Sequence, residues 1–400
     1  MTKEKSTVPR LRFPGFTDAW KQRKLGEVAE MYSGGTPSVG RKDYYAGGIP
    51  FIRSAEINSD TTELYLTELG LNNSSAKMVS KGSLLYALYG ATSGEVGLSR
   101  LDGAINQAIL AILPNDDLTT EFLMYWLRRE KSIIVEKYLQ GGQGNLSAGI
   151  VKQLAPTFPT LPEQEAIGSF FSDLDQLITL HQRKLDDVKE LKKALLQKMF
   201  PKGNGNDFPE LRFPEFTDAW KQRKLGEFMK ESKILGSKGD IARKLTVRLW
   251  GRGVVSKKEI YSGSSATQYY IRKSGQFIYG KLDFLNQAFG IIPPELDGYE
   301  STLDSPAFDL LKGINGQFLL EFVSRKEFYY YQGNIANGSR KAKRIHTETF
   351  LGMPISLPTL PEQEAIGNFF SDLDQLITLH QRQLDHLKLL KKALLQQMFI

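Results

Sequence analysis

The fold is decided by a stretch that the chain contains twice. Residues 162–200 read PEQEAIGSFFSDLDQLITLHQRKLDDVKELKKALLQKMF, and residues 361–399 read PEQEAIGNFFSDLDQLITLHQRQLDHLKLLKKALLQQMF. Through most of each copy, apolar residues follow one another at alternating intervals of four and three. Such a heptad pattern, sustained over about five heptads, is typical of a coiled-coil helix. Each copy therefore predicts one long helix.

These helices begin and end with suitable residues, and their apolar seam needs a partner. A proline and acidic residues open each copy and lysines close it, which suits the two ends of a helix dipole. At 1.5 Å per residue, each helix is expected to be about 55 Å long. The best-matched partner for one seam is the other copy, so we expect the helices to pair into one rod. The predicted seam contains Ile167, Phe171, Leu174, Ile178, His181, Leu185, Ile366, Phe370, Leu373, Ile377, His380 and Leu384.

A second stretch is also repeated, near the start of each half. Residues 11–28 read LRFPGFTDAWKQRKLGEV and residues 211–228 read LRFPEFTDAWKQRKLGEF. The chain is thus a tandem repeat of a short lead, a variable region and a long helix. We place its parts at residues 1–158 (first variable domain), 159–200 (first helix), 201–210 (a linker rich in Gly, Asn and Pro), 211–357 (second variable domain) and 358–400 (second helix).

The two variable regions are expected to share one α+β fold while differing in surface. Both contain short strand-like apolar runs, and each has a late helical pattern, at residues 119–138 and 314–331. Faint echoes connect them: residues 82–86 resemble 275–279, and residues 106–108 resemble 286–288. A surface that occurs twice almost unchanged is suited to binding two copies of one partner, or to binding the other repeat of this chain. Different surfaces on a common fold suit the reading of two different targets.

Composition excludes several classes of protein. An apolar fraction of 41% and a charged fraction of 24% are those of a soluble globular chain. There are no cysteines, which excludes disulfides and thiolate metal sites and makes the cytoplasm the default location. No apolar run approaches the roughly 20 residues of a membrane span. The net charge of +7 permits a polyanionic partner without proving one.

No catalytic constellation stands out. The sequence lacks a phosphate-binding Gly-x-x-x-x-Gly-Lys-Ser/Thr loop, a His-Glu-x-x-His zinc motif and a Gly-x-Ser-x-Gly nucleophile elbow. His181 and His380 lie in the predicted seam, where a polar residue sets pairing register rather than binding a metal. We therefore predict a non-catalytic chain with no metal and no cofactor of its own. A two-headed protein scaffold and an enzyme with an unfamiliar site remain the alternatives.

Candidate DNA-binding residues lie in the variable regions. Glycine-rich loops let backbone approach a ligand, amides pair with base edges, and basic residues contact phosphates. The competing interpretation is plain turns and a solvated basic surface. In the first region the candidates are Ser33, Gly35, Thr36, Ser38, Tyr89, Thr92, Ser93, Gln143 and Asn145; in the second they are Lys281, Asn334, Asn337, Ser339, Arg340, Lys341, Lys343 and Arg344.

These features together resemble a known family. The tandem layout, the Leu-Pro-Glu-Gln-x-x-Ile start of each long helix at 161–167 and 360–366, and the Gly-Gly-Thr-Pro-Ser loop at 34–38 are similar to the specificity (S) subunits of type I restriction–modification enzymes. The chain looks most like the staphylococcal-type members. The second variable region lacks the Gly-Gly-Thr-Pro-Ser loop, so its base-reading residues are less well defined.

The resemblance implies a division of labour. Each variable region is expected to be a target-recognition domain that contacts one half of a split, asymmetric site in double-stranded DNA. The long helices are expected to form an antiparallel coiled coil that fixes the spacer between the half-sites. Two modification (M) subunits, carrying S-adenosylmethionine, would methylate adenine N6. Two restriction (R) subunits, using ATP and Mg, would complete the nuclease.

Overall fold

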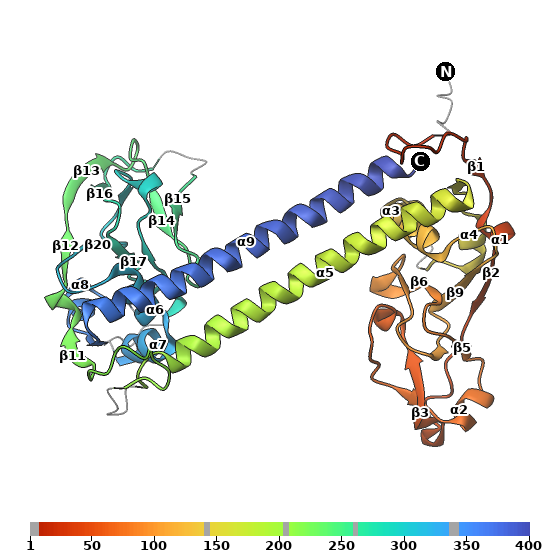
Figure 1. Ribbon diagram of the computed structural model, residues 1–400, viewed down its shortest axis with the longest axis horizontal. Helices are drawn as coiled ribbons and strands as arrows, with labels where there is room; N and C mark the ends of the chain where they lie inside the picture. The colour runs from red at the N-terminus through yellow and green to blue at the C-terminus, as the bar shows by residue number, and fades with distance from the viewer. Residues whose placement is uncertain (1–7, 140–144, 203–207, 259–262, 336–343) are drawn as a thin grey trace. The chain divides into compact units, whose positions relative to one another are not determined.

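The computed structural model describes residues 8–139, 145–202, 208–258, 263–335 and 344–400 (Figure 1). The chain divides into two compact units. The first unit contains residues 1–182 and 382–400, and the second contains residues 183–381. Each long helix therefore contributes one part to each unit. The domain boundaries drawn from the repeat remain predictions, because the units are defined by contacts rather than by the repeat.

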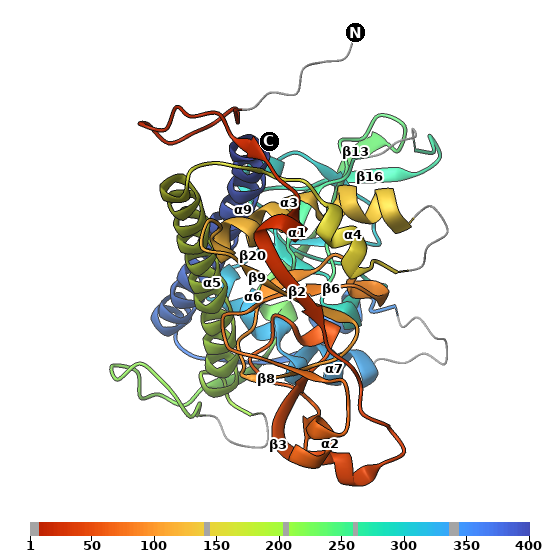
Figure 2. The same cartoon turned by 90° about the vertical axis from the view of Figure 1, so that its right-hand side faces the viewer.

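The first unit contains two four-stranded sheets whose strands are interleaved along the chain (Figure 2). One has the strand order β2-β9-β6-β7 and the other β4-β3-β8-β5. A two-stranded pair, β1 with β10, ties the lead to the start of the long helix. The elements are β1 (Lys21–Gln22), α1 (Leu25–Val28), β2 (Ala29–Ser33), η1 (Lys42–Tyr44), β3 (Tyr45–Ile52), η2 (Ser54–Glu56), β4 (Tyr65–Leu66), α2 (Glu68–Asn72), β5 (Lys77–Val79), β6 (Leu84–Ala87), η3 (Gly90–Thr92), β7 (Val96–Leu98), β8 (Gly103–Ile105), β9 (Ile109–Pro114), α3 (Thr120–Leu139), α4 (Ala148–Gln153), β10 (Thr157–Phe158) and α5 (Leu161–Lys198).

The second unit has an equivalent main sheet and an equivalent two-stranded pair, but its other strands are arranged differently. Its main sheet has the order β12-β20-β17-β18, and β11 pairs with β21 as β1 pairs with β10. The elements are β11 (Lys221–Lys224), η4 (Leu225–Glu227), β12 (Met229–Ser232), β13 (Ile234–Lys238), β14 (Leu245–Val247), β15 (Val254–Ser256), β16 (Gln268–Ile271), β17 (Phe277–Tyr279), η5 (Phe284–Asn286), β18 (Phe289–Ile291), η6 (Pro294–Leu296), β19 (Glu300–Ser301), β20 (Ala307–Leu310), α6 (Gly316–Ser324), α7 (Lys326–Ile335), α8 (Thr347–Leu351), β21 (Pro354–Leu357) and α9 (Leu360–Met398).

The expected mixed α/β fold, with two similar domains and two long helices, is confirmed. The long helices have 38 and 39 residues. The late helical pattern of the first region is α3, and the late pattern of the second region is also helical, with one break. It is split into α6 and α7 because Arg325 adopts an extended conformation, with φ −74° and ψ 141°.

One of the two sequence echoes between the variable regions is confirmed and the other is not. Residues 82–86 and 275–279 form equivalent strands, β6 and β17, which occupy the same place in their sheets. Residues 106–108 precede β9, whereas residues 286–288 precede β18. Because β9 corresponds to β20 rather than to β18, this resemblance does not reflect structural equivalence.

The repeated Pro-Glu-Gln at each helix start joins three parts of its unit. Glu163 is fully buried and accepts two hydrogen bonds from Arg12 of the lead, at 2.6 and 2.7 Å. Gln164 accepts from the backbone N–H of Thr119 at 3.0 Å, and its amide donates to the carbonyls of Asp117 and Pro159. The equivalent residues of the second unit form the same hydrogen bonds. Arg212 donates to Glu362. Gln363 accepts from the N–H of Asn315 and donates to the carbonyls of Gly313 and Pro358.

The phenylalanine that follows each long helix packs into the core of the unit that is formed mainly by the other repeat. Phe399, which follows α9, lies in the core of the first unit against Phe122, with ring centroids 5.1 Å apart. Phe200, which follows α5, lies in the core of the second unit against Phe318 at 5.6 Å. Each unit thus takes one core aromatic residue from the repeat that forms most of the other unit.

The predicted seam residues are all buried or half-buried. In the first unit Lys391 of α9 donates a hydrogen bond to Asp175 of α5. In the second unit Lys192 of α5 donates to Asp374 of α9 at 2.7 Å. The repeat relates these two pairs, so α5 and α9 meet through the same contact in each unit.

Candidate nucleic-acid interface

One end of the main sheet in the first unit gathers three loops. The last residue of β2, Ser33, pairs with Leu110 near the start of β9, and the last residue of β6, Ala87, pairs with Ile109. Because neighbouring strands are antiparallel, the segments after β2, after β6 and before β9 emerge at the same end. The loops at residues 34–41, 88–95 and 106–108 therefore meet there. Most of the predicted candidates in this unit lie in them.

Hydrogen bonds connect these loops around the turn at residues 106–108. The hydroxyl of Thr36 donates to Oε1 of Gln107 at 2.5 Å. The backbone N–H of Leu88, next to Tyr89, donates to the carbonyl of Ala108 at 2.8 Å. Leu146, next to Asn145, donates from its N–H to the carbonyl of Leu88 at 3.0 Å. The structure thus brings Thr36, Tyr89 and Asn145 to one turn.

The candidates differ in how freely a ligand can reach them. Thr36, Ser38 and Asn145 are exposed, whereas Tyr89 is half-buried. Ser93 is 6% exposed, and its hydroxyl donates to the carbonyl of Gly90 at 2.8 Å. The hydroxyl of Thr92 likewise donates within its own turn. Ser93 and Thr92 therefore stabilise the conformation of the loop. The exposed side chains of Thr36, Ser38 and Asn145 are the ones that a ligand can reach. Gln143 lies outside the described residues.

The paired glycines after β2 are needed for packing. A Cβ atom at Gly34 would lie 1.8 Å from the carbonyl oxygen of Ile105, and one at Gly35 would lie 1.9 Å from the hydroxyl of Ser75. Any side chain at either position would displace the loop. These glycines fix where Thr36 lies by allowing the chain to pass close to β8. Gly35 itself is buried.

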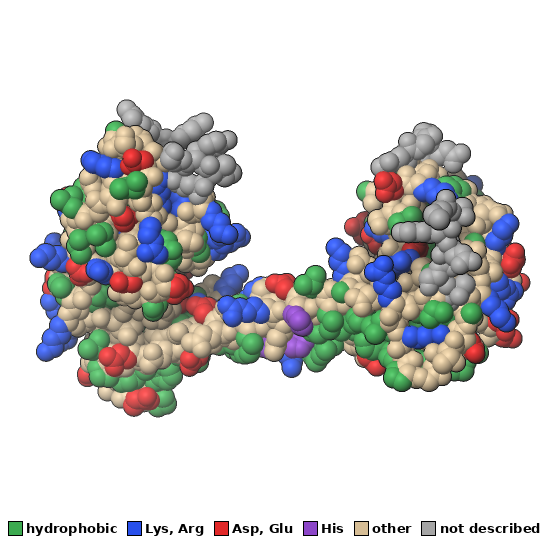
Figure 3. Space-filling model, turned by 90° about the horizontal axis from the view of Figure 1, so that it is seen from above, with side chains coloured by type: hydrophobic (Ala, Val, Ile, Leu, Met, Phe, Trp, Pro, Cys, Tyr) green, Lys and Arg blue, Asp and Glu red, His purple; other side chains and the backbone are tan. Residues whose placement is uncertain are grey.

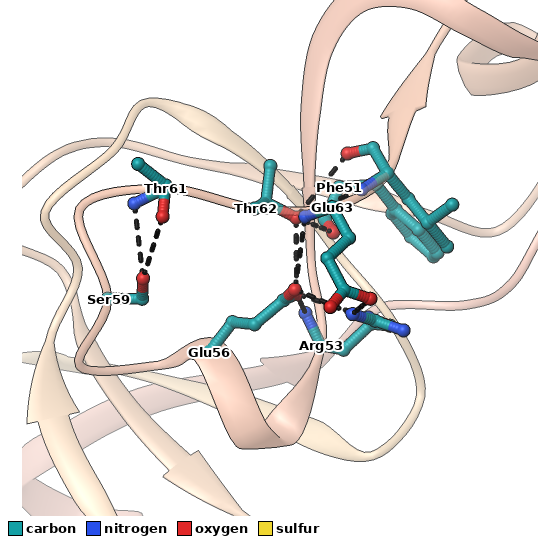
Figure 4. Close-up of polar contacts among 8 residues, drawn as sticks. Phe51, Arg53, Glu56, Ser59, Thr61, Thr62 and Glu63 are labelled. Atoms are coloured by element: carbon teal, nitrogen blue, oxygen red, sulfur yellow. Dashed lines mark hydrogen bonds and ion pairs between the residues drawn. The ribbon is translucent and has the colours of Figure 1, made fainter. Parts of the chain in front are cut away.

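A polar network stiffens the adjoining loop (Figure 4). β3 and β8 are parallel, with Ile52 opposite Ile105, so Arg53 emerges beside Asn106 and Gln107. Arg53 donates to both Glu56, at 2.7 Å, and Glu63, at 2.6 Å. Burial of the Glu56 carboxylate acts to raise its pKa, but hydrogen bonds from Arg53 and from the Glu63 backbone lower that pKa to about 2. The loop is therefore held in one shape by a charged pair.

We expect Glu56→Gln to destabilise the first unit by about 1 kcal/mol near neutral pH, because Arg53 loses its ionised partner while staying partly solvated. The pKa of Glu56 lies below the value of about 4.3 for an unfolded glutamate. Its contribution is therefore present above that pH and is lost as the pH falls toward 2. Denaturant unfolding of both proteins should show a difference that narrows as the solution is acidified.

Glu63→Gln is the matched control for this experiment. Glu63 bonds the same arginine, but its side chain is 80% exposed, so its loss should change the unfolding free energy little. Equal effects of the two substitutions would contradict a special role for Glu56.

The corresponding sheet end of the second unit gathers basic residues. Lys281 follows β17 and donates from its N–H to the carbonyl of Asp304 at 2.8 Å. Ile345 donates from its N–H to the carbonyl of Lys281 at 3.0 Å, as Leu146 does to Leu88 in the first unit. Arg344 forms an ion pair with Asp304 at 3.1 Å. Lys281 and Arg344 are therefore brought together.

Other candidates in this unit are placed differently. Asn334 is exposed near the end of α7, and its amide donates to the carbonyl of Tyr330 at 2.7 Å. The remaining predicted residues lie outside the described part of the chain; they are Asn337, Ser339, Arg340, Lys341 and Lys343. Figure 3 shows Lys and Arg side chains (blue) on the surface of each unit.

Residues that the sequence did not single out support the same sheet ends. Gln107 is exposed and holds Thr36, and Arg53 shapes the neighbouring loop. Arg272 of the second unit is fully buried, and burial lowers its pKa to about 10. It donates to the hydroxyl of Ser301 at 2.7 Å and to the carbonyl of Ser232 at 2.8 Å, which fixes the end of β12. Of these residues, only Gln107 could have been noticed in the sequence, because Asn106–Gln107 recurs as Asn286–Gln287. We interpreted that recurrence as similarity between the two halves and not as a sign of a binding site.

Two further properties of the described residues bear on the choice of function. No group of three or more His, Asp or Glu side chains among them is placed to hold a metal ion. None of the helices in this part of the chain is long and apolar enough to cross a membrane. The molecule presents two units of one fold on a repeated frame, each ending its main sheet in a different polar surface. This arrangement gives the chain two distinct candidate binding surfaces.

Comparison with known proteins narrows the class further. The family model described as the type I restriction modification DNA specificity domain matches residues 17–190 and 218–389. The chain belongs to this family of type I DNA specificity domains, and the resemblance seen in the sequence is confirmed.

Similar proteins with names, and one solved structure, agree with this family assignment. The MjaIX specificity subunit of Methanocaldococcus jannaschii is 24% identical over 53% of this chain, and the chain spans about half of that relative's length, 52%. The MjaVIII specificity subunit of the same organism is 21% identical over 96% of this chain and 92% of the relative. The S subunit of a type I system from M. genitalium has 14% identity, a TM-score of 0.65, and coverage of 98% of this chain and 99% of that one. At this identity the last likeness shows a shared fold.

Proposed function

We propose that this chain is the specificity subunit that reads DNA for a type I restriction–modification complex, with each unit reading one half of a bipartite, asymmetric site. The observation that carries the proposal is the contrast between the two sheet ends. The frame is repeated almost residue for residue, but one sheet end presents hydroxyls and amides and the other presents Lys281 and Arg344. Two different surfaces on one frame suit two different half-sites.

We also propose that α5 and α9 pair as an antiparallel coiled coil that sets the spacer between the half-sites. The equivalent contacts of Asp175 with Lys391 and of Asp374 with Lys192 support this pairing, as does the burial of the predicted seam. A rigid helical pair would hold the two readers at a fixed separation along the duplex.

Repeated surface leucines suggest where the partners bind. Leu177 and Leu180 on α5 are 41% and 47% exposed, and their equivalents on α9, Leu376 and Leu379, are 38% and 51% exposed. Hydrophobic side chains (green) are visible on the surface of the long helices (Figure 3). Identical apolar residues displayed in both repeats suit two copies of one partner. We propose that two modification subunits dock there.

The proposed complex divides the chemistry among its subunits. This chain is non-catalytic and holds no cofactor, and it works in the cytoplasm. The modification subunits bind S-adenosylmethionine and methylate adenine N6, and two restriction subunits use ATP and Mg for cleavage. The chain's own residues recognise and position the DNA.

A map of N6-methyladenine across the genome tests the proposal directly. Cells would express this chain with its candidate modification subunit, and control cells would lack one component. A split motif that appears only with both would support the specificity role and would reveal the site. If no methylation depends on this chain, the two-headed scaffold becomes the better explanation.

Docking on the leucines makes a separate prediction. Leu180→Glu should remove one modification subunit from the complex, and Leu180→Glu with Leu379→Glu should remove both, because a buried carboxylate is costly in an apolar interface. Light scattering of the purified complex would measure the loss. Thr179→Glu is the matched control, because Thr179 is an exposed polar residue of the same helix that points away from the face of Leu177 and Leu180. Retention of both partners by the double variant would contradict this docking site.

A further inference from the structure

A hairpin in the second unit carries an exposed tryptophan at its tip. β14 and β15 pair from Leu245 opposite Ser256 to Val247 opposite Val254. Leu245, Val247 and Val254 are buried in an apolar cluster with Ile278 of β17, which anchors the hairpin to the main sheet. The tip, residues 248–253, reads Arg-Leu-Trp-Gly-Arg-Gly, and Trp250 is 57% exposed. The hairpin therefore holds a large aromatic ring in solvent on a fixed base.

The backbone of the tip is held in a strained conformation. Trp250 has φ +60° and Gln287 has φ +53°, two of the three non-glycine residues with positive φ in the described chain. The two sites contact each other: the N–H of Trp250 donates to the carbonyl of Asn286 at 2.7 Å, and that of Gly251 donates to the carbonyl of Gln287 at 3.1 Å. A bulky residue keeps a left-handed backbone only where its surroundings impose it, and such sites cluster at ligand-binding positions.

The tip adjoins the sheet end that carries the candidate DNA-binding residues. Gln287 leads into Ala288, whose carbonyl accepts a hydrogen bond from the N–H of Gly280 at 2.9 Å. The next residue is Lys281, which is held beside Arg344 through Asp304 and Ile345. The hairpin tip and the predicted basic surface thus lie on one continuous stretch of this unit.

The charges of the tip fit an anionic partner. Arg248 and Arg252 flank Trp250, and both are exposed. Neither forms an ion pair with any described residue, and the tip contains no acidic side chain. An aromatic ring between two available guanidinium groups matches the chemistry of nucleic-acid binding, in which rings stack on bases or sugars and arginines contact phosphates.

We infer that the hairpin tip at residues 248–253 is a second DNA-contacting element of this unit, in which Trp250 packs against a base or deoxyribose while Arg248 and Arg252 contact phosphates. This inference rests on the proposed DNA-reading function. It assigns to the second half-site a contact for which the first unit has no counterpart, because the first unit's tryptophans, Trp20 and Trp126, are buried.

Trp250→Gly separates a binding role from a structural one. Glycine adopts a positive φ freely, so this change should leave the stability of the chain unchanged or raise it. Affinity for DNA should fall by about tenfold, the effect expected when one stacked aromatic residue is lost. Leu249→Ala is the matched control, because Leu249 is the 37% exposed neighbour in the same tip. Binding would be measured with the complete complex of this chain and its modification subunit.

Fluorescence gives a second readout without a substitution. The other three tryptophans, Trp20, Trp126 and Trp220, are between 2% and 6% exposed, so a solvent quencher reaches Trp250 far more easily. A duplex carrying the split motif found by methylation mapping should protect Trp250 from acrylamide. A duplex with the second half-site scrambled should protect it less.

The outcomes are distinct. Normal DNA affinity of Trp250→Gly, together with quenching of Trp250 in the unsubstituted chain that DNA does not change, would overturn the inference while leaving the proposed function intact. Protection of Trp250 by the modification subunit alone, without DNA, would also overturn it, because the tip would then contact protein. If wild-type chain directs no methylation at all, the proposed function fails, and the inference fails with it.

Discussion

Phe399→Ala is expected to destabilise the first unit by about 3–5 kcal/mol, although Phe399 belongs to the second repeat. The side chain is 2% exposed and packs against Phe122, Phe171 and Trp20, with centroid distances of 5.1, 6.0 and 6.5 Å. Truncation leaves a cavity among rigid aromatic rings that cannot collapse into it. Hydrogen exchange should show faster opening of β2, β6 and β9, with the second unit unaffected.

Phe200→Ala provides the reciprocal experiment. Phe200 occupies the equivalent position in the second unit, against Trp220, Phe318 and Phe370. Its loss should open β12, β17 and β20 and spare the first unit. If either substitution loosened only the unit formed by its own repeat, the exchange of aromatic residues between repeats would be contradicted.

Glu163→Ala is expected to lower the free energy of unfolding of the first unit by about 3–5 kcal/mol. This is the usual penalty for leaving one member of a buried ion pair without its partner. The Glu163 side chain is fully buried and that of Arg12 is only 10% exposed. The hydrogen bonds that Arg12 donates to Glu163 raise the pKa of Arg12. Because a guanidinium is protonated at neutral pH even without that help, the arginine stays charged when its partner is removed. Thermal unfolding of the two proteins, followed in the first unit, measures the difference.

Two further substitutions bracket this prediction. Glu163→Gln keeps the shape and accepts one hydrogen bond from Arg12, so it should cost less than Glu163→Ala. Glu210→Ala removes an ion pair between two exposed side chains, Glu210 (52%) and Lys202 (62%), and should change stability little. A small effect of Glu163→Ala would mean that the lead is not anchored through this pair.

The long helices could be predicted from the sequence because their information is local. A heptad pattern states which face of a helix is buried, and α5 and α9 begin within two residues of the positions that the pattern indicates. The repeat likewise predicted two similar domains, since two copies of one lead and one helix require equivalent neighbours. The split between α6 and α7 at Arg325 was missed, because its side chain packs over Phe200 from a distant part of the chain.

The candidate site was only partly predictable, because its residues are defined by pairing between distant strands. The Gly34–Gly35 pair indicated a close approach of backbone, but not that the neighbours are Ile105 and Ser75. The role of Gln107 depends on a hydrogen bond across 71 residues. Trp250 gave no sequence signal, since its importance comes from its exposure and left-handed backbone.

The exchange of aromatic residues also has a consequence for the order in which the protein is made. Chains emerge from the ribosome N-terminus first, and domains generally fold as they appear. The core of the first unit is not complete in that order until Phe399 of the second repeat has been synthesised. In the second unit, Phe200 is translated before most other residues of the core, so this aromatic side chain is present from the start. The half that is synthesised first is therefore the half that is finished last.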